Sequence, residues 1–197
     1  MALTPSSADT ALDISSRALI LIGAEPISSF DDGTTEALVC VNLYEDVIQA
    51  ALVNTRWRFA TNQKVLNQLS DAPTGRYDLA YQLPSDLIML HAITVNDNLV
   101  EYQVYGDKVY ADTATSDVVI ADYTFRANEQ DFPSYFTLAV EFSLAVILAT
   151  SIARDPALAS LMTQRADAAM AKARSTDSQQ QTTRKLETSR FLTARRS

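Results

Sequence analysis

The sequence predicts an α+β protein: a mainly helical bundle with a small antiparallel β-sheet inserted in it, followed by an extended C-terminal arm. Apolar residues recur at helical spacing near both ends of the chain. Between Lys64 and Arg126 the pattern changes to short alternating runs separated by turn-forming residues, as in antiparallel strands. We therefore expect one cored domain over residues 1–178, with its sheet at about 63–127, and an arm over 179–197.

Two helices are expected at the N-terminal end. The first spans residues 7–22, and Gly23 is placed to end it because glycine readily adopts the left-handed backbone of a helix C-terminus. The second spans residues 34–54, with Thr34 or Thr35 as its N-cap, and should pack back against the first. Its apolar positions share one face: Ala37, Val41, Tyr44, Ile48, Ala51 and Leu52.

The middle of the chain predicts two hairpins. Asn96 to Asn98 should connect strands at 93–95 and 99–105, because Asn and Asp tolerate the positive φ angles of tight turns. Gly106 and Asp107 should then reverse the chain into a strand at 108–111. Further strands are expected around residues 65–69, 81–83 and 118–125.

Two more helices are expected after the sheet. One spans residues 133–153 and begins at Pro133, and the next spans 156–174, with Asp155 as its cap and Pro156 at its first position. Polar residues interrupt the apolar helix 133–153, so it is predicted to be a core helix and not a membrane span. The alanine-rich last helix should fade into the polar run 175–178, where the folded domain ends.

The chain offers few groups for catalysis. His91 is the only histidine, so no histidine cluster can bind a metal, and the four glycines lie too far apart to form a phosphate-binding loop. The only cysteine, Cys40, is predicted to be a buried thiol. We expect no catalytic residue, metal site or cofactor. An enzyme would require a carboxylate constellation that the sequence does not single out.

Charge is distributed unevenly along the chain. Residues 1–153 hold 7 Lys and Arg against 20 Asp and Glu, whereas residues 154–197 hold 9 against 4. A basic and aromatic run, Arg56 to Phe59, could be a nucleic-acid patch. A tryptophan that directly follows a helix is more typical of a buried helix–sheet junction, and we favour that interpretation of Trp57.

The C-terminal arm combines basic residues with apolar ones. Its charge would steer it to a partner, and its large apolar side chains would anchor it there. A tail without a function remains the alternative. The basic residues are Arg184, Lys185, Arg190, Arg195 and Arg196, and the anchors are Leu186, Phe191 and Leu192.

Three blocks of residues occur in an order that a known family shares. The first, at 18–60, holds a Leu-x-x-Ile-Gly-x-x-Pro-Ile stretch, a Ser-Phe-Asp-Asp turn, a helix with Tyr44 at its middle, and Trp-x-Phe-Ala at 57–60. The second is Tyr-x-Leu-Pro-x-Asp at 81–86, and the third is Asp-Pro at 155–156 opening a long alanine-rich helix. In this order they resemble the tail tubular protein A family, the head-to-tail adaptors of short-tailed bacteriophages.

The resemblance implies a virion structural protein, made in the host cytoplasm, that is neither an enzyme nor a membrane protein. Neighbouring copies would form a dodecameric ring in the phage neck, below the portal protein. The ring would extend the DNA channel and support the tail or nozzle protein. Related adaptors occur in longer-tailed phages, so the resemblance indicates the neck position better than the tail type.

An acidic body suits a DNA channel that must not retain DNA, because like charges repel. Hairpin ends can project into such a channel, so four loop carboxylates are the candidates to line it: Asp97, Asp107, Asp112 and Asp117. The alternative function is a small DNA-binding or regulatory protein that uses the basic C-terminal tail. Such a regulator should have a basic folded face, which the charge of this body disfavours.

Overall fold

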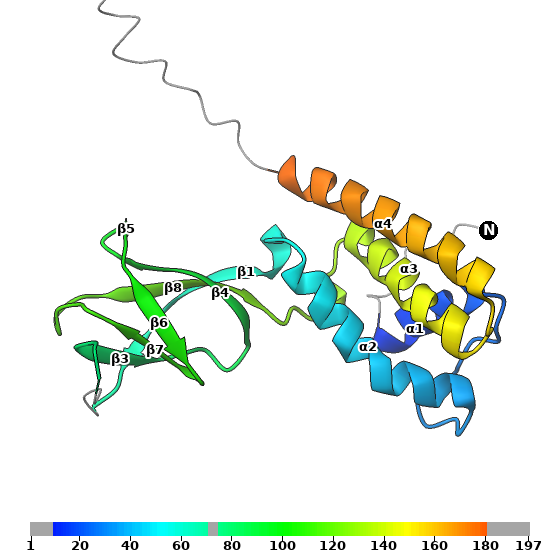
Figure 1. Cartoon of the computed structure of the whole chain (residues 1–197), viewed down its shortest axis with the longest axis horizontal. Helices are drawn as coiled ribbons and strands as arrows, with labels where there is room; N and C mark the ends of the chain where they lie inside the picture. Colours follow the sequence, from blue (N-terminus) through cyan, green and yellow to red (C-terminus); the bar gives the residue numbers. More distant parts are fainter. Residues whose placement is uncertain (1–9, 71–74, 181–197) are drawn as a thin grey trace, which may run out of the picture.

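A computed structural model describes residues 10–70 and 75–180. The chain forms two lobes, a helical lobe and a β lobe, joined at a narrow waist (Figure 1). The chain passes between the lobes twice, at residues 54–60 and 126–133. The predicted α+β class is confirmed. The helices are α1 (Ala11–Leu21), α2 (Thr35–Val53), α3 (Ser134–Ser151) and α4 (Pro156–Ser178).

Local sequence sets where the helices begin. Thr10 caps α1 through a capping box with Asp13, and its extended backbone (φ −109°, ψ 163°) makes the predicted start at residue 7 wrong. Thr34 caps α2, as expected, by accepting a hydrogen bond from the Ala37 N–H. Asp155 caps α4 with Pro156 at its first position, also as expected.

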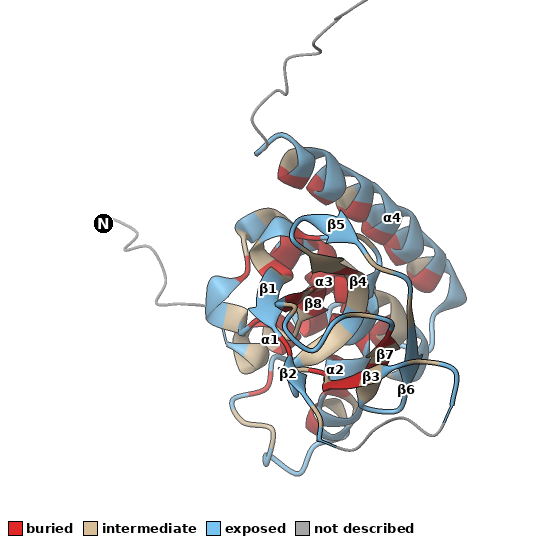
Figure 2. Cartoon of the chain, turned by 90° about the vertical axis from the view of Figure 1, so that its left-hand side faces the viewer, coloured by how far each residue is buried: buried red, intermediate tan, exposed pale blue. Residues whose placement is uncertain are grey.

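Helix α3 forms the centre of the helical lobe. By length and composition it could cross a membrane. In the lobe, however, α1, α2 and α4 pack around it, and its side chains from Phe136 to Ala149 are mostly buried. Helix α4 covers it with a face made mainly of alanine and methionine side chains, and its other face is exposed (Figure 2). The predicted core helix is confirmed.

The β lobe holds two four-stranded antiparallel sheets where one was predicted. We call the sheet β1-β8-β4-β5 the first sheet and the sheet β2-β3-β7-β6 the second sheet. Their inner faces enclose a small core around Tyr81, Ile93, Val109 and Tyr123. The strands are β1 (Thr61–Val65), β2 (Asn67–Gln68), β3 (Leu79–Gln82), β4 (Leu87–Val95), β5 (Asn98–Leu99), β6 (Tyr102–Tyr105), β7 (Lys108–Ala111) and β8 (Val119–Phe125).

Both predicted turns form, but one predicted strand is divided. Asn96 and Asp97 take positive φ angles of 50° and 63° between β4 and β5, and Gly106 (φ 62°) lies between β6 and β7. The predicted strand 99–105 is wrong, because the chain leaves the first sheet at Val100 and enters the second at Tyr102. Val100 donates its N–H to the Ile93 carbonyl and packs against the β-lobe core, which draws the chain across between the sheets.

The last helix runs further than predicted. Residues 175–178 continue α4 for another turn because Asp177 is buried (4% exposed) and hydrogen-bonded to both α3 and the waist. Polar composition alone indicated a linker there. The residues are helical nevertheless, because the tertiary contacts of the Asp177 carboxylate outweigh the local preference of the polar sequence.

Candidate functional site

The predicted arm residues lie outside the described part of the chain. This holds for Arg184, Lys185, Leu186, Arg190, Phe191, Leu192, Arg195 and Arg196. The residue before this segment, Gln180, is placed: its side-chain amide donates to the Tyr135 hydroxyl at 3.3 Å. The structure therefore fixes where the arm leaves the body.

Asp177 holds that exit point against the waist. Its Oδ1 accepts a hydrogen bond from the Tyr135 hydroxyl (2.8 Å), and its Oδ2 accepts one from the Arg58 N–H (3.2 Å). Arg58 also donates its Nε to the Asp177 carbonyl at 3.0 Å. Burial and the hydrogen bond to Asp177 raise the pKa of the Tyr135 phenol to about 12. The end of α4 is thus fastened to α3 and to the base of β1.

The four predicted channel carboxylates lie in turns of the β lobe, but the structure does not gather them. Asp97 lies in the β4–β5 turn, and Asp117 lies just before β8, which pairs with β4 at that end of the first sheet. Asp107 and Asp112 flank opposite ends of β7 in the second sheet.

Three of these four carboxylates also stabilise loops. Asp107 accepts from Gln82 Nε2 (3.1 Å), and this hydrogen bond is the main reason that its pKa is lowered. Asp112 accepts from the Asp78 N–H, and Asp117 accepts from the Ala114 N–H. Each therefore has a structural role besides its charge.

The outer face of the first sheet carries an exposed apolar row. Cross-strand pairs point to one face of a sheet, and Val65 pairs with Ile120, Ile120 with Thr94, and Thr94 with Leu99. Val118 extends this face two residues before Ile120. We call Val65, Leu99, Val118 and Ile120 the outer row. Leu99 is 79% exposed, Val65 56% and Val118 54%.

A polar pocket of about 620 Å³ lies between the outer row and the end of α4. It is lined by Arg56, Arg58, Thr61, Asn62, Gln63 and Asp122. Arg56 forms an ion pair with Asp122, but the other carboxylate oxygen, Asp122 Oδ1, is buried without a hydrogen-bond partner among the described residues. Asp122 and Gln63 share the outer face of the sheet, so the pocket opens beside the outer row.

His91 lies near this pocket, in an irregularity of β4 between Leu90 and Ala92. A ring nitrogen, Nε2, is 2.7 Å from the Thr124 hydroxyl oxygen. Burial and the nearby Arg56 lower the pKa of the imidazole, although Asp122 opposes them. The predicted structural role of His91 in a strand agrees with this placement.

Arg126 connects the lobes on the other side of the waist. Its guanidinium donates to both oxygens of Glu45 on α2 (2.9 to 3.1 Å) and to Glu129 Oε1 (2.6 Å). Burial disfavours its charge, but these carboxylates raise its pKa overall. The Tyr44 hydroxyl donates to the same Glu129 oxygen at 3.3 Å. This network links α2 to the chain that returns from the β lobe.

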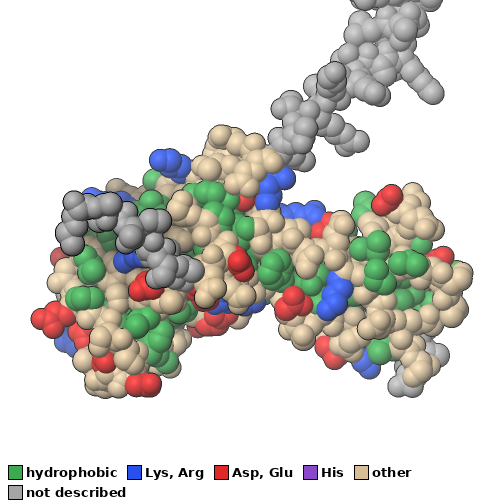
Figure 3. Space-filling model, turned by 180° about the vertical axis from the view of Figure 1, so that it is seen from behind, with side chains coloured by type: hydrophobic (Ala, Val, Ile, Leu, Met, Phe, Trp, Pro, Cys, Tyr) green, Lys and Arg blue, Asp and Glu red, His purple; other side chains and the backbone are tan. Residues whose placement is uncertain are grey.

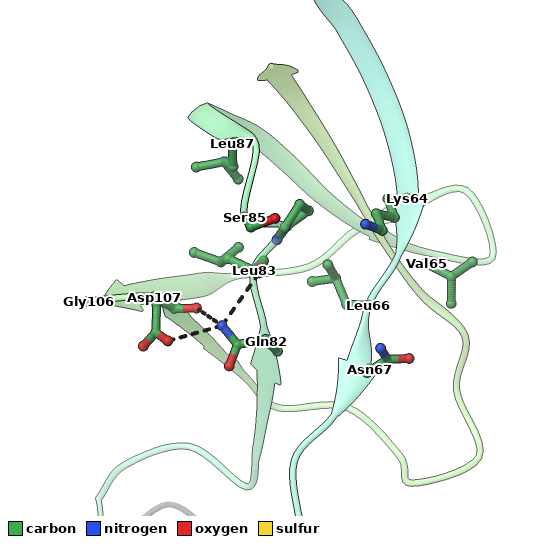
Figure 4. Close-up of a pocket in the computed structure, with 11 residues that line it drawn as sticks. Lys64, Val65, Leu66, Asn67, Gln82, Leu83, Ser85, Leu87, Gly106 and Asp107 are labelled. Carbon is green, nitrogen blue, oxygen red and sulfur yellow. Dashed lines mark hydrogen bonds between the residues drawn. The ribbon is translucent and has the colours of Figure 1, made fainter. Parts of the chain in front are cut away.

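A groove of about 560 Å³ lies where the two sheets meet (Figure 4). Apolar side chains of Leu66, Leu83 and Leu87 line it, and Gln82 donates to Asp107 at its edge. Lys64 and Asp107 are its only charged lining residues. Their arrangement includes no paired acid and base or activated nucleophile.

No group of three or more His, Cys, Asp or Glu side chains within 10–70 and 75–180 could hold a metal ion. Cys40 is fully buried, and burial raises the pKa of its thiol to about 11. Trp57 is also fully buried, as predicted, and its indole N–H donates to the Ala51 carbonyl at 2.8 Å.

Sequence reasoning missed three features of these surfaces. Asp177 stands in a polar run that resembles a linker, and the pairing of Arg56 with Asp122 joins residues far apart in the chain. The outer row was missed because its members belong to different strands, and only the register brings them together. The one available signal was the valine pair Val118–Val119, which points an apolar side chain to each face of a strand.

Comparison with protein-family models gave no match. A search of curated proteins likewise found no relative.

Proposed function

We propose that this protein is a structural head-to-tail adaptor of a bacteriophage. In this role it forms a ring below the portal, extends the DNA channel and supports the tail or nozzle. The observation that carries the proposal is the position of the family-like blocks in the fold. These blocks lie where secondary-structure elements end or meet. Gly23 follows the end of α1, and Tyr44 hydrogen-bonds to Glu129 at the waist. Trp57 is buried where the chain passes from α2 to the β lobe, and Asp155 caps α4. A resemblance carried by residues that end or connect elements supports a shared architecture and not a shared catalytic site.

The exit of the C-terminal segment supports the same role. Its first residues follow a helix end that Asp177 fixes to the body. Seventeen further residues carry five basic and three large apolar side chains. A basic segment that leaves a fixed point could reach and wrap a neighbouring ring, because segments that fold on binding cover large surfaces.

The pairing of the basic residues disfavours the alternative of a DNA-binding regulator. Arg56 pairs with Asp122 and Arg126 pairs with Glu45 and Glu129, so both are already engaged by carboxylates. The loop carboxylates Asp97 and Asp117 would repel DNA at the far end of the first sheet. We therefore retain them, with Asp107 and Asp112, as candidates to line the channel.

Binding to the cognate portal ring tests the proposal. Removing residues 181–197 should abolish co-sedimentation with portal rings, and the helical circular-dichroism signal should remain. Phe191→Ala should weaken binding by roughly 30-fold, because a buried aromatic anchor can contribute about 2 kcal/mol. Arg190→Ala should cost less, since an exposed ion pair contributes about 0–1 kcal/mol.

The matched control is Leu161→Ala, which changes a half-exposed apolar residue on α4 outside the arm and should leave binding unchanged. Equal retention of the full-length, shortened and Phe191→Ala proteins would refute the docking role of the arm. Failure of the full-length protein to bind any portal would refute the adaptor function.

A further inference from the structure

The adaptor role proposed above does not by itself say what contacts the outer row. Three of its four side chains are more than half exposed. Val65 lies on β1, Ile120 on β8 and Leu99 on β5, with Thr94 of β4 between the last two, so the row extends from one edge of the first sheet to the other. Contiguous exposed apolar surface on a soluble protein marks a contact site. From behind, hydrophobic side chains gather on the β lobe, and Lys and Arg side chains gather at the waist (Figure 3).

We propose that residues 184–197 of the same chain bind across this face and cover the outer row in the free protein. Complementary charge favours this segment as the partner of the outer row. Residues 61–125 carry three Lys and Arg against nine Asp and Glu, whereas residues 181–197 carry five basic residues against Glu187 alone. An acidic lobe with an apolar stripe complements a basic segment with apolar anchors.

The position of the exit point makes this contact reachable. Gln180 follows Asp177, which bonds Arg58, and Arg58 lies three residues before β1 begins. From Thr61 to Val65 the strand rises about 13 Å, and the sheet is about 14 Å wide from β1 to β5. Six extended residues span roughly 20 Å, so Leu186 can reach Val65, and twelve span roughly 40 Å, so Leu192 can reach Leu99.

The route between these points suits the residues that would follow it. Gln181, Thr182 and Thr183 would cross the polar pocket, whose lining side chains include hydrogen-bond donors and acceptors that match their own polar groups.

The far end of the route is acidic. Asp97, Glu101 and Asp117 flank Leu99 and Val118 in the chain, so they surround the distal part of the outer row. Arg190, Arg195 and Arg196 would lie next to them if Phe191 and Leu192 contact the row. The surface therefore offers a polar pocket, an apolar stripe and an acidic end, and the segment offers polar residues first and then basic residues interspersed with its apolar anchors.

Disulfide trapping in the full-length protein tests the contact. The pair Leu99→Cys with Leu192→Cys should form an intramolecular disulfide under mild oxidation at least about tenfold faster than the control pair Val53→Cys with Leu192→Cys. Val53 is a stringent control because it is exposed and lies beside Asn54, which Arg174 of α4 contacts, close to the exit point. The buried Cys40 should not compete.

A rate for Leu99→Cys no higher than that of the control would overturn the proposal. Disulfides that form only between two chains would also overturn it, because they would assign the outer row to a second copy. No portal is present in this experiment, so its failure leaves the adaptor proposal standing, and the failure of portal binding leaves this contact standing.

Proteolysis gives a second measurement without cysteines. Trypsin should cut after Arg184, Lys185 and Arg190 about fivefold faster in the Val65→Ser/Leu99→Ser variant than in the wild type, because cleavage follows the population of the released segment. The control variant Leu38→Ser/Val41→Ser changes two exposed apolar residues of α2 and should cleave at the wild-type rate. Equal rates in all three proteins would refute the contact.

Discussion

The two lobes bury very different amounts of apolar side chain. Among the residues that the structure describes, the core of the helical lobe contains 27 buried hydrophobic residues and that of the β lobe contains 8. The helical lobe is built on α3, which is covered on most sides, while the first sheet of the β lobe leaves one face largely uncovered. Apolar burial is thus concentrated in the helical lobe, which should contribute more of the stability, whereas the β lobe leaves an apolar face available for the contact that we propose.

Removing a side chain from the smaller core tests whether the two lobes differ in stability. Ile93 on β4 is fully buried between the sheets, and Ile93→Ala should cost about 2–5 kcal/mol. Because the β lobe has few core residues to share the loss, we expect it to open locally. Hydrogen exchange should accelerate in β4, β7 and β8 and stay near wild-type rates in α3.

The matched substitution in the larger core is Leu144→Ala on α3, also fully buried. Since the β lobe depends on the helical lobe at the waist, this variant should accelerate exchange in both lobes. If Ile93→Ala accelerates exchange equally in both lobes, the lobes unfold as one unit and do not differ in local stability.

The accuracy of the sequence analysis differs between the lobes for a related reason. The helical lobe follows local signals, so the caps Thr34 and Asp155, the end at Gly23 and the burial of Trp57 were all predictable. The predicted helix boundaries were wrong where the interactions of a single side chain determine the end of the helix. Thr10 stops the first helix, and Asp177 extends the last one through contacts with residues over 40 positions away.

In the β lobe, turns were predictable and pairing was not. The positive φ angles of Asn96 and Asp97 are a property of their residue types, but the division of strand 99–105 depends on Val100 entering a core built by distant strands. The same limit applies to the surfaces. The arm residues and loop carboxylates could be named from composition, whereas the outer row depends on register.

The hydrogen bonds of Asp177 at the waist should contribute to the stability of the folded chain. Asp177→Asn keeps the side-chain shape but replaces one acceptor oxygen by a donor, so either the Arg58 N–H or the proton of the Tyr135 hydroxyl loses its acceptor. We expect a loss of about 1–3 kcal/mol in the free energy of unfolding, measured by urea denaturation. The control Asp167→Asn, on the exposed face of α4, should change stability by less than about 0.5 kcal/mol. A loss no greater than in the control would show that the last turn of α4 is an unanchored extension.

The smallest effect is expected at Glu45, on the other side of the waist, and its sign depends on pH. The hydrogen bonds from Arg126 lower the pKa of Glu45, so the ionised carboxylate favours the folded state. A lowered pKa in the folded state stabilises the protein above the ordinary carboxyl pKa, and this stabilisation disappears as the pH falls through the folded value. The Glu45 side chain is 48% exposed, so solvent screening limits the contribution to about 0.5 kcal/mol. Glu45→Gln should therefore lower the melting temperature slightly at pH 7, and the difference from the wild type should shrink toward zero as the pH falls through and below the lowered carboxyl pKa. The neighbouring Asp46→Asn, also on the exposed side of α2, should not reproduce this pH dependence. A difference that is constant with pH would assign the role of Glu45 to packing, and the waist would then be held by shape and not by charge.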